Sequence, residues 1–239
     1  QISSFLVAPA ALLYEIRICT NIRIGHDKIK YMETLAQKKA RALKVIRFLK
    51  KKFPDAKISL KYNNPIQLLV AVILSAQCTD KKVNEVTVNI FKEYQTAGDF
   101  AQLSHKQLEQ LIHSCGFYRN KAKNIITACK IIQTKFKGRL PKTMSEMLTL
   151  PGVARKTANV VLGNAHGVVE GIAVDTHMIR LNQKLGFTQE NNPVKIEKDL
   201  MQLIPKKEWF GYTYRIIDYG RTVCPARHKK CDCEIYKIK

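Results

Sequence analysis

A lysine beside a tight turn is the residue of this sequence best suited to covalent chemistry. Pro151-Gly152 predicts a turn, and residues 157–162 have the composition of a packed helix. Lys156 then falls in the first helical turn, where the positive end of the helix dipole disfavours a second positive charge, and an uncharged amine is a nucleophile. We also expect a phosphate site at the backbone N–H groups that lack helical acceptors, those of Val153, Ala154 and Arg155.

A carboxylate follows nineteen residues later, in the sequence Val174-Asp175-Thr176-His177. Asp175 precedes an amphipathic segment and fits a helix N-cap, which is the commonest role for an aspartate in that position. A carboxylate close to a nucleophilic amine can also stabilise the cation-like sugar that forms when an N-glycosidic bond breaks. The pair Lys156 and Asp175 therefore predicts catalysis, while a phosphate-contacting lysine and a capping aspartate remain the simpler alternatives.

Residues 150–162 resemble the signature LPGVGRKTANVVL of the endonuclease III family of helix-hairpin-helix DNA glycosylases at all but one position. The exception is Ala154, where the family usually has a second glycine. The resemblance implies that Lys156 attacks C1′ of the sugar and that Asp175 faces it across a cleft. It further implies a bifunctional DNA glycosylase and AP lyase, which removes oxidised pyrimidines from duplex DNA and cleaves the strand by β-elimination.

Two other functions stay open at this point. No residue that we can name fixes the shape of the base pocket, so a related glycosylase with another base preference is one alternative. A non-catalytic helix-hairpin-helix DNA-binding protein is the other. The joint presence of Lys156 and Asp175 argues against a purely binding module.

Two further segments resemble loops with which the family fills the gap left by a flipped nucleotide. Residues 74–80 resemble the LSAQATD loop, whose glutamine corresponds to Gln77. Residues 116–122 resemble the GLYNSKA loop, where Phe117 takes the place of a leucine wedge and could also stack on a base. Taken alone, each segment also fits an ordinary loop between helices. The DNA contacts implied by all these motifs are Gln77, Phe117, Lys121, Gly152, Val153, Ala154 and Arg155.

The cysteines near the end of the chain depart from the family pattern. The family commonly binds a [4Fe–4S] cluster through C-x6-C-x2-C-x5-C, whereas this chain has Cys224-x6-Cys231-x-Cys233 and no later cysteine. Such clusters normally need four thiolates. We therefore expect no cofactor requirement and a degenerate, metal-free loop. If a cluster were bound, Cys224, Cys231 and Cys233 would be its ligands in an incomplete set.

Helical periodicity dominates the sequence, and no alternating pattern long enough for a sheet is present. This predicts an all-α fold. The resemblance implies the helix-hairpin-helix glycosylase fold, with two helical domains and a DNA-binding cleft between them: a six-helix domain over 58–168, and a second over 33–57 plus 169–239. Residues 1–31 read as an extension of unknown role. The other helices are predicted over 33–53, 65–76, 80–91, 100–114, 120–136, 144–148, 174–185, 193–204 and 209–219.

The charge balance points to a polyanionic partner. The chain has 41 basic and 19 acidic residues and a net charge of +22. Such a surplus fits nucleic acid or an acidic membrane surface. No run of 18 apolar residues occurs, which argues against a membrane span. We expect a monomer that binds duplex DNA containing damaged bases or abasic sites. The odd number of cysteines suits a reducing cytoplasm, where the protein would associate with the nucleoid.

Overall fold

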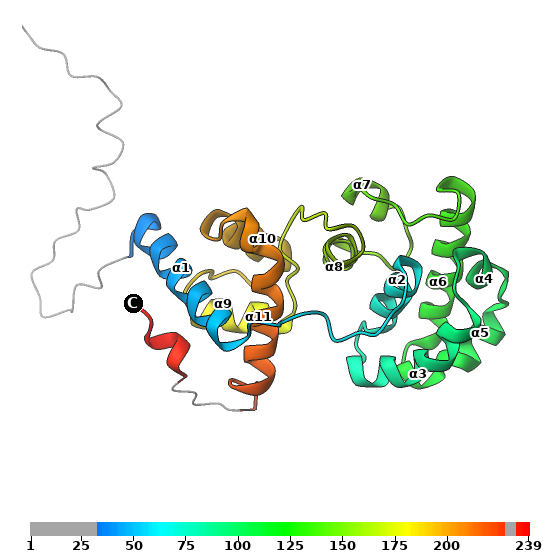
Figure 1. The fold of residues 1–239 in the computed structure, drawn as a ribbon, viewed down its shortest axis with the longest axis horizontal. Helices are drawn as coiled ribbons and strands as arrows, with labels where there is room; N and C mark the ends of the chain where they lie inside the picture. The colour runs from blue at the N-terminus through cyan, green and yellow to red at the C-terminus, as the bar shows by residue number, and fades with distance from the viewer. Residues whose placement is uncertain (1–32, 228–232) are drawn as a thin grey trace, which may run out of the picture. The chain divides into compact units, whose positions relative to one another are not determined.

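The computed structural model describes residues 33–227 and 233–239. Thr34–Lys239 form one compact unit (Figure 1). Within the described residues all regular structure is helical, so the all-α prediction is confirmed. The predicted extension, residues 1–31, lies outside the described residues.

Seven helices share the first hydrophobic core, which contains buried residues from Leu60 to Leu162. At its centre is α2, in which every residue from Ile66 to Leu74 is buried. This helix packs against α3, α6 and α8. Because α2 is apolar on all sides, the other helices can surround it. The seven are α2 (Pro65–Leu74), α3 (Asp80–Glu93), α4 (Ala97–Gln102), α5 (His105–Ile112), α6 (Tyr118–Lys135), α7 (Met144–Met147) and α8 (Arg155–His166).

The remaining helices share a second core, built from residues 42–49 together with residues 172–235. Its largest fully buried side chains are Tyr212 and Tyr219 of α11. The helices are α1 (Leu35–Lys52), α9 (Thr176–Lys184), α10 (Pro193–Leu203) and α11 (Trp209–Thr222), with the short 3-10 turns η3 (Lys206–Glu208) and η4 (Glu234–Lys237). We call the two groups of helices the α2–α8 half and the α1/α9–α11 half. The residues of these two halves nearly coincide with the two domains expected from the sequence. The division into domains itself stays a prediction.

The single helix predicted over 100–114 is wrong, because the chain forms α4 and α5 there. Leu103 is extended, with ψ of 138°, and ends α4. Ser104 then starts α5 with a capping box, in which its side chain accepts from the N–H of Gln107 and the Gln107 side chain accepts from the N–H of Ser104. A serine followed three residues later by glutamine is a typical start of a helix, and it outweighs the continuous apolar periodicity.

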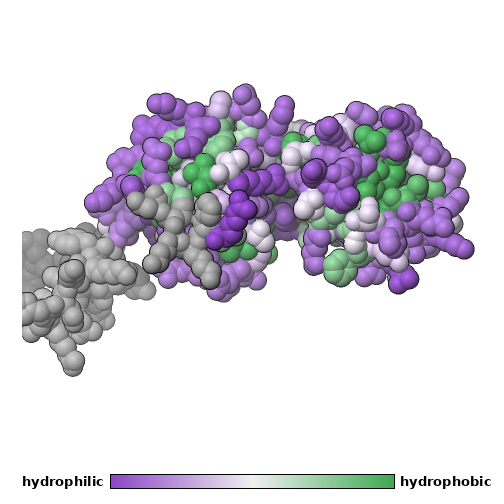
Figure 2. Space-filling view, turned by 90° about the horizontal axis from the view of Figure 1, so that it is seen from below, coloured by the Kyte–Doolittle hydropathy of each residue, from purple (hydrophilic) through white to green (hydrophobic). Residues whose placement is uncertain are grey.

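Hydrophilic side chains cover most of the face drawn in Figure 2, with apolar residues in separate patches. Among the described residues, no helix is both long enough and apolar enough to cross a membrane.

Candidate active site

The turn before α8 depends on a glycine. Gly152 has φ of 77°, and a Cβ atom there would lie 2.9 Å from Cβ of Asn124. Both observations favour glycine, which tolerates positive φ and close approach. Ala154 is the N-cap of α8, and no side chain caps this helix end. The first-turn N–H groups therefore have no acceptor from their own helix or from a capping side chain.

Val153 differs from the expectation. Its N–H donates to the carbonyl of Leu150 at 3.2 Å, and its side chain is buried in the first core. The backbone donor of Val153 is thus used inside the turn and is not free for a phosphate. Around Val153, the residues that remain accessible for a phosphate are Gly152 and Ala154, which are exposed, and Arg155, which is partly exposed.

The structure brings Lys156 and Asp175 to one cavity. Lys156 lies in the first turn of α8, and Asp175 is the N-cap of α9, so the two side chains come from different halves. The cavity has a volume of about 230 Å³. Its lining combines polar side chains from both halves with apolar ones: Ile58, Leu60, Val72, Ser75, Ala76, Gln77, Asp80, Lys156, Thr157, Val160, Ala173, Asp175, Thr213, Tyr214, Ile217 and Arg221.

Three groups hold Asp175 as a carboxylate. Burial raises its pKa, but the nearby His177 side chain, the Met178 N–H and the charge of Lys156 lower it more, and the net pKa lies below the usual value. Nδ1 of His177 lies 3.1 Å from Oδ2, and the N–H of Met178 donates to Oδ1 at 2.8 Å. Asp175 therefore caps α9 and still presents a negative charge to the cavity that Lys156 lines.

Asp80 and Arg221 line the cavity and also a larger open hollow of about 880 Å³ beside it. Nη2 of Arg221 lies 2.8 Å from Oδ2 of Asp80, and Nη1 donates to Oγ of Ser59 at 3.2 Å. Ser59 also donates to Asp80. This network joins α11 to the start of α3, so it connects the two halves at the cavity wall.

Four residues that line these hollows were not predicted to be part of the site. Asp80 and His177 lie within motifs quoted above, but the motifs did not indicate what these two side chains do. Arg221 and Tyr214 carried no sequence signal. Tyr214 accepts a hydrogen bond of 2.6 Å from Nδ2 of Asn164, and burial raises its pKa to about 12. It is therefore a neutral wall of the cavity.

Gln77 and Phe117 both have left-handed backbones. Their φ values are 53° and 48°, a region that non-glycine residues seldom occupy. Both are exposed, and Phe117 is 64% exposed although its ring is large and apolar. Unfavourable backbone and exposed side chain together are typical of residues held in place for a ligand.

Lys121, expected as a possible phosphate contact, is instead buried at 5% exposure. Its ammonium donates to the carbonyl of Leu74 and to that of Cys115, each at 2.8 Å. Burial lowers its pKa. These two carbonyls lie where helical segments end and need donors, and the long lysine side chain reaches both. Lys121 thus acts as an internal brace between these two carbonyls, and its ammonium is not free to contact a phosphate.

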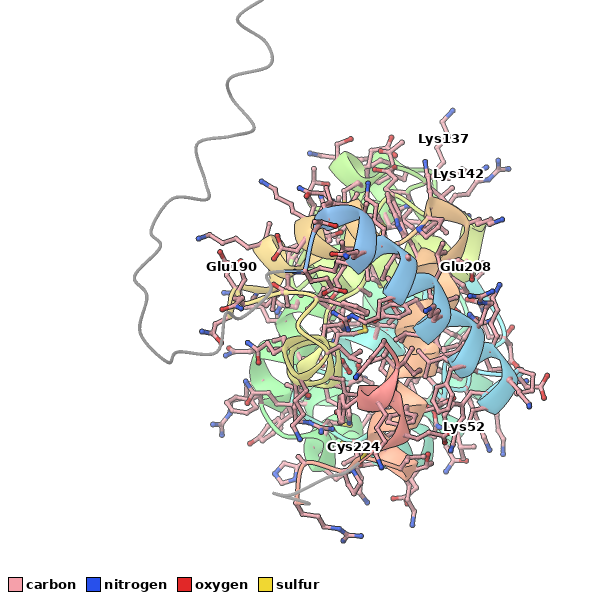
Figure 3. All side chains as sticks on the ribbon, turned by 90° about the vertical axis from the view of Figure 1, so that its left-hand side faces the viewer. Lys52, Lys137, Lys142, Glu190, Glu208 and Cys224 are labelled. Carbon is pink, nitrogen blue, oxygen red and sulfur yellow. The ribbon has the colours of Figure 1, made fainter. Side chains whose placement is uncertain are left out.

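Cys224 lies just after the end of α11, beside η4 (Figure 3). Its sulfur is buried, 3.4 Å from the hydroxyl of Tyr236 and 3.5 Å from Nη1 of Arg180. Cys233 is also buried, whereas Cys231 lies outside the described residues. No group of three or more possible metal ligands occurs in residues 33–227 and 233–239. The donor set does not fit a [4Fe–4S] cluster, because the sequence has three cysteines here and such a cluster normally needs four thiolates.

Known proteins resemble this chain over most of its length. Endonuclease III of Synechocystis sp. is 51% identical over 205 residues, covering 85% of this chain and 94% of the relative. Endonuclease III of Bacillus subtilis is 43% identical over 188 residues, covering 78% and 85%. A solved non-covalent endonuclease III–DNA complex superimposes with a TM-score of 0.78 at 42% identity, covering 84% and 94%. A trapped endonuclease III–DNA covalent intermediate gives the same values.

Residues 70–206 match the family described as HhH-GPD superfamily base excision DNA repair protein. The chain belongs to this superfamily and, within it, to the endonuclease III family. The resemblance noted from residues 150–162 is confirmed, and so is the helix-hairpin-helix glycosylase fold.

Proposed function

We propose that this chain is a bifunctional DNA glycosylase and AP lyase, which removes oxidised pyrimidines from duplex DNA with Lys156 as nucleophile and Asp175 as its carboxylate partner. One observation carries the proposal: two elements far apart in the sequence, the first turn of α8 and the N-cap of α9, present an amine and a carboxylate to one cavity. Family membership supports the same activity.

The chemistry follows from these two groups. As the bond between the base and C1′ breaks, positive charge develops on the sugar, and the negative charge of Asp175 stabilises it. The amine of Lys156 bonds to C1′ while the base leaves with the electron pair of the broken bond. Loss of a proton from nitrogen and opening of the sugar ring give a Schiff base. Loss of a proton from C2′ then expels the 3′ phosphate, which cuts the strand, and water releases the lysine.

Borohydride trapping tests the assignment of Lys156. Sodium borohydride added during turnover should reduce the Schiff base and join protein to DNA covalently. Lys156→Gln should give no adduct and should still bind the same duplex, because the rest of the DNA surface is intact. An adduct of undiminished yield in Lys156→Gln would exclude this lysine as the nucleophile. The solved covalent intermediate of a related endonuclease III supports a reaction of this kind.

We further propose that Gln77 and Phe117 enter the DNA where the damaged nucleotide has left the stack. Both are exposed on strained backbones, and Gln77 also lines the cavity. An amide offers a donor and an acceptor to the unpaired opposite base, and an aromatic ring can stack or wedge. Gly152 and Ala154 would contact the DNA backbone at the N-terminus of α8, with Arg155 beside them.

We propose that the protein performs this reaction without an iron–sulfur cluster. The sequence supplies three cysteines in place of four, and the Cys224 sulfur is contacted by Tyr236 and Arg180. Purified protein should be colourless, and iron and acid-labile sulfide should fall far below one cluster per chain. Cys224→Ser should retain nearly full glycosylase activity. Near-stoichiometric iron and sulfide in anaerobically prepared protein would overturn this part of the proposal.

The proposed substrate, DNA, suggests where the protein acts. Among the described cysteines, Cys78, Cys115, Cys129 and Cys224 have free thiols, whereas Cys233 is disulfide-bonded. We propose that the enzyme works on the nucleoid in the cytoplasm, as a monomer.

A further inference from the structure

The carboxylate of Glu197 connects the two halves beside the first turns of α8. Glu197 lies on α10, and its side chain is only 5% exposed. Oε2 lies 2.6 Å from Nε of Arg155, and Oε1 accepts a hydrogen bond of 2.9 Å from Nδ2 of Asn159. Arg155 and Asn159 are one turn apart on α8, on either side of Lys156 in the sequence. Glu197 therefore holds the helical turn that carries Lys156.

The same carboxylate touches the segment that leads to Asp175. A Cβ atom at Gly171 would collide with Oε1 of Glu197 and would lie 3.0 Å from Nδ2 of Asn159. The next three residues, 172–174, are buried and run directly to Asp175. One side chain is thus in contact with both backbone segments that set the separation of Lys156 and Asp175.

Burying a carboxylate between two groups of helices costs free energy unless the charge is paired and hydrogen-bonded. Apolar side chains of similar size often give equal or greater stability. The hydrogen bonds of a carboxylate are directional, however, so they fix orientation in a way that apolar contacts do not. Glu197 does not line the 230 Å³ cavity, although it lines a small hollow of about 30 Å³ together with Arg155, Lys156 and Asn159. Its hydrogen-bond partners on α8 are Arg155 and Asn159, so it acts by positioning α8.

We propose that Glu197 is a positioning residue, which sets the distance and angle between Lys156 and Asp175 by holding the first turn of α8 against the segment 171–174. This inference rests on the proposed function, because it takes Lys156 as the nucleophile. Displacing a reacting group by about 1 Å can slow a reaction about 100-fold. The loss should appear in the chemical step. DNA affinity should change little and should not weaken, because removing the negative charge of Glu197 leaves the positive charge of Arg155 in place beside the DNA backbone.

The test measures borohydride trapping in single turnover on an abasic-site duplex at saturating protein, with the Kd for the same duplex measured separately. Glu197→Ala should trap about 10- to 100-fold more slowly than the wild type, with Kd changed by less than about 3-fold. Glu197→Gln should recover most of the rate. Its amide keeps an acceptor for Arg155. A 180° rotation of the Asn159 amide, whose Nδ2 now donates to Glu197, lets the glutamine NH2 donate to Oδ1 of Asn159, a buried atom that has no hydrogen-bond partner within the described part of the chain.

Glu208, labelled in Figure 3, provides the matched control. It is also buried and lies 2.6 Å from Nζ of Lys50, but it lies in η3 and its ion pairs, with Lys50 of α1 and Arg215 of α11, stay inside one half. Glu208→Ala removes a buried carboxylate and its ion pair, as Glu197→Ala does, and should trap at the wild-type rate. Thermal melts select an assay temperature at which each variant is folded. If Glu197→Ala does not fold, Glu197→Asp replaces it, because a shorter side chain cannot reach α8 in the same way.

Gly171→Ala approaches the same contact from the other side. The added methyl group displaces the Glu197 carboxylate, so trapping should slow in the wild-type background. In the Glu197→Ala background the space is vacant, and the same substitution should have much less effect. The four proteins form a double-mutant cycle, and strictly additive effects would contradict the proposed contact.

The outcomes separate this inference from the proposed function. If the wild type forms no adduct on any abasic or lesion duplex, the proposed function fails and the positioning role fails with it. If the wild type forms the adduct and Glu197→Ala forms it equally fast, only the positioning role is overturned. Equal slowing by Glu208→Ala would likewise reduce Glu197 to a stabilising ion pair.

Discussion

At the scale of single residues, Asp175 combines two functions that a substitution can separate. Asparagine also caps helices well, so Asp175→Asn should keep α9 intact and change mainly the charge in the cavity. We expect lesion binding to persist and base removal to slow by about 100- to 1,000-fold, because a charge complementary to the transition state is lost. Single-turnover base release on an oxidised-pyrimidine duplex measures this. Full activity in Asp175→Asn would leave the residue as a helix cap only.

The lowered pKa of Asp175 predicts how this group contributes to stability as pH changes. Its folded pKa lies below the unfolded value of 3.8, so its charged form stabilises the fold above that value. The contribution is lost as pH falls through the folded pKa. The difference in unfolding free energy between the wild type and Asp175→Asn should therefore be present at about pH 5 and should shrink as the pH falls through the folded pKa of Asp175. Chemical denaturation across this range checks it, and a difference independent of pH would argue against the lowered pKa.

Single residues also show where sequence reasoning succeeded and where it could not. Lys156 and Asp175 stood out because their types and their neighbours carry chemistry, and the fold brings them to one cavity. Lys121 was expected to contact DNA, but its ammonium is buried and donates to the backbone carbonyls of Leu74 and Cys115. Every residue has a backbone carbonyl, so the sequence does not indicate which carbonyls lack a donor, and only the folded chain shows it.

At the scale of elements, the N-cap of α6 presents Phe117, the residue that we propose enters the DNA. Phe117→Ala should slow base removal from a stably paired lesion more than strand cleavage at an abasic site, because less unpairing is needed where no base remains. The ratio of the two single-turnover rates is the measurement. Leu43→Ala is the control, since Leu43 is an exposed apolar residue of α1, at 43% exposure, outside the cavity lining. Equal slowing of both reactions by Phe117→Ala would contradict a wedge role.

Most helices could be predicted because their apolar periodicity and their capping residues agree. Asn64 before Pro65 and Thr79 before Asp80 mark the starts of α2 and α3, and both act as N-caps in the structure. The segment 100–114 failed because a capping box at Ser104 competes with an unbroken apolar pattern. Where the two signals conflict, the local hydrogen bonds of Ser104 and Gln107 decide the boundary.

At the scale of the whole molecule, the net charge of +22 predicts binding that depends strongly on salt. If about five phosphates are neutralised, the logarithm of the association constant should fall with the logarithm of salt concentration at a slope of about −4.5. Lys156→Gln allows the titration to be made on a lesion duplex without turnover. A flat dependence would mean that the positive charge serves something other than DNA.

The relation between the two halves was beyond prediction from residues alone. Arg221 and Asp80 are 141 positions apart, and Arg155 and Glu197 are 42 apart. Each pair joins helices whose own sequence patterns say nothing about their partner. The family resemblance implied two domains with a cleft between them, but it did not predict which ion pairs connect the two halves.

The brace formed by Lys121 has a consequence for how the protein searches DNA. Its ammonium binds the carbonyl of Leu74, three residues before Gln77, and that of Cys115, two residues before Phe117. The brace therefore limits the spacing of Gln77 and Phe117, the two side chains that we propose enter the DNA, before any DNA is bound, and little ordering entropy remains to be lost at each encounter. A protein that must sample very many intact base pairs gains from a probe of constant width, since each rejected step then costs little time.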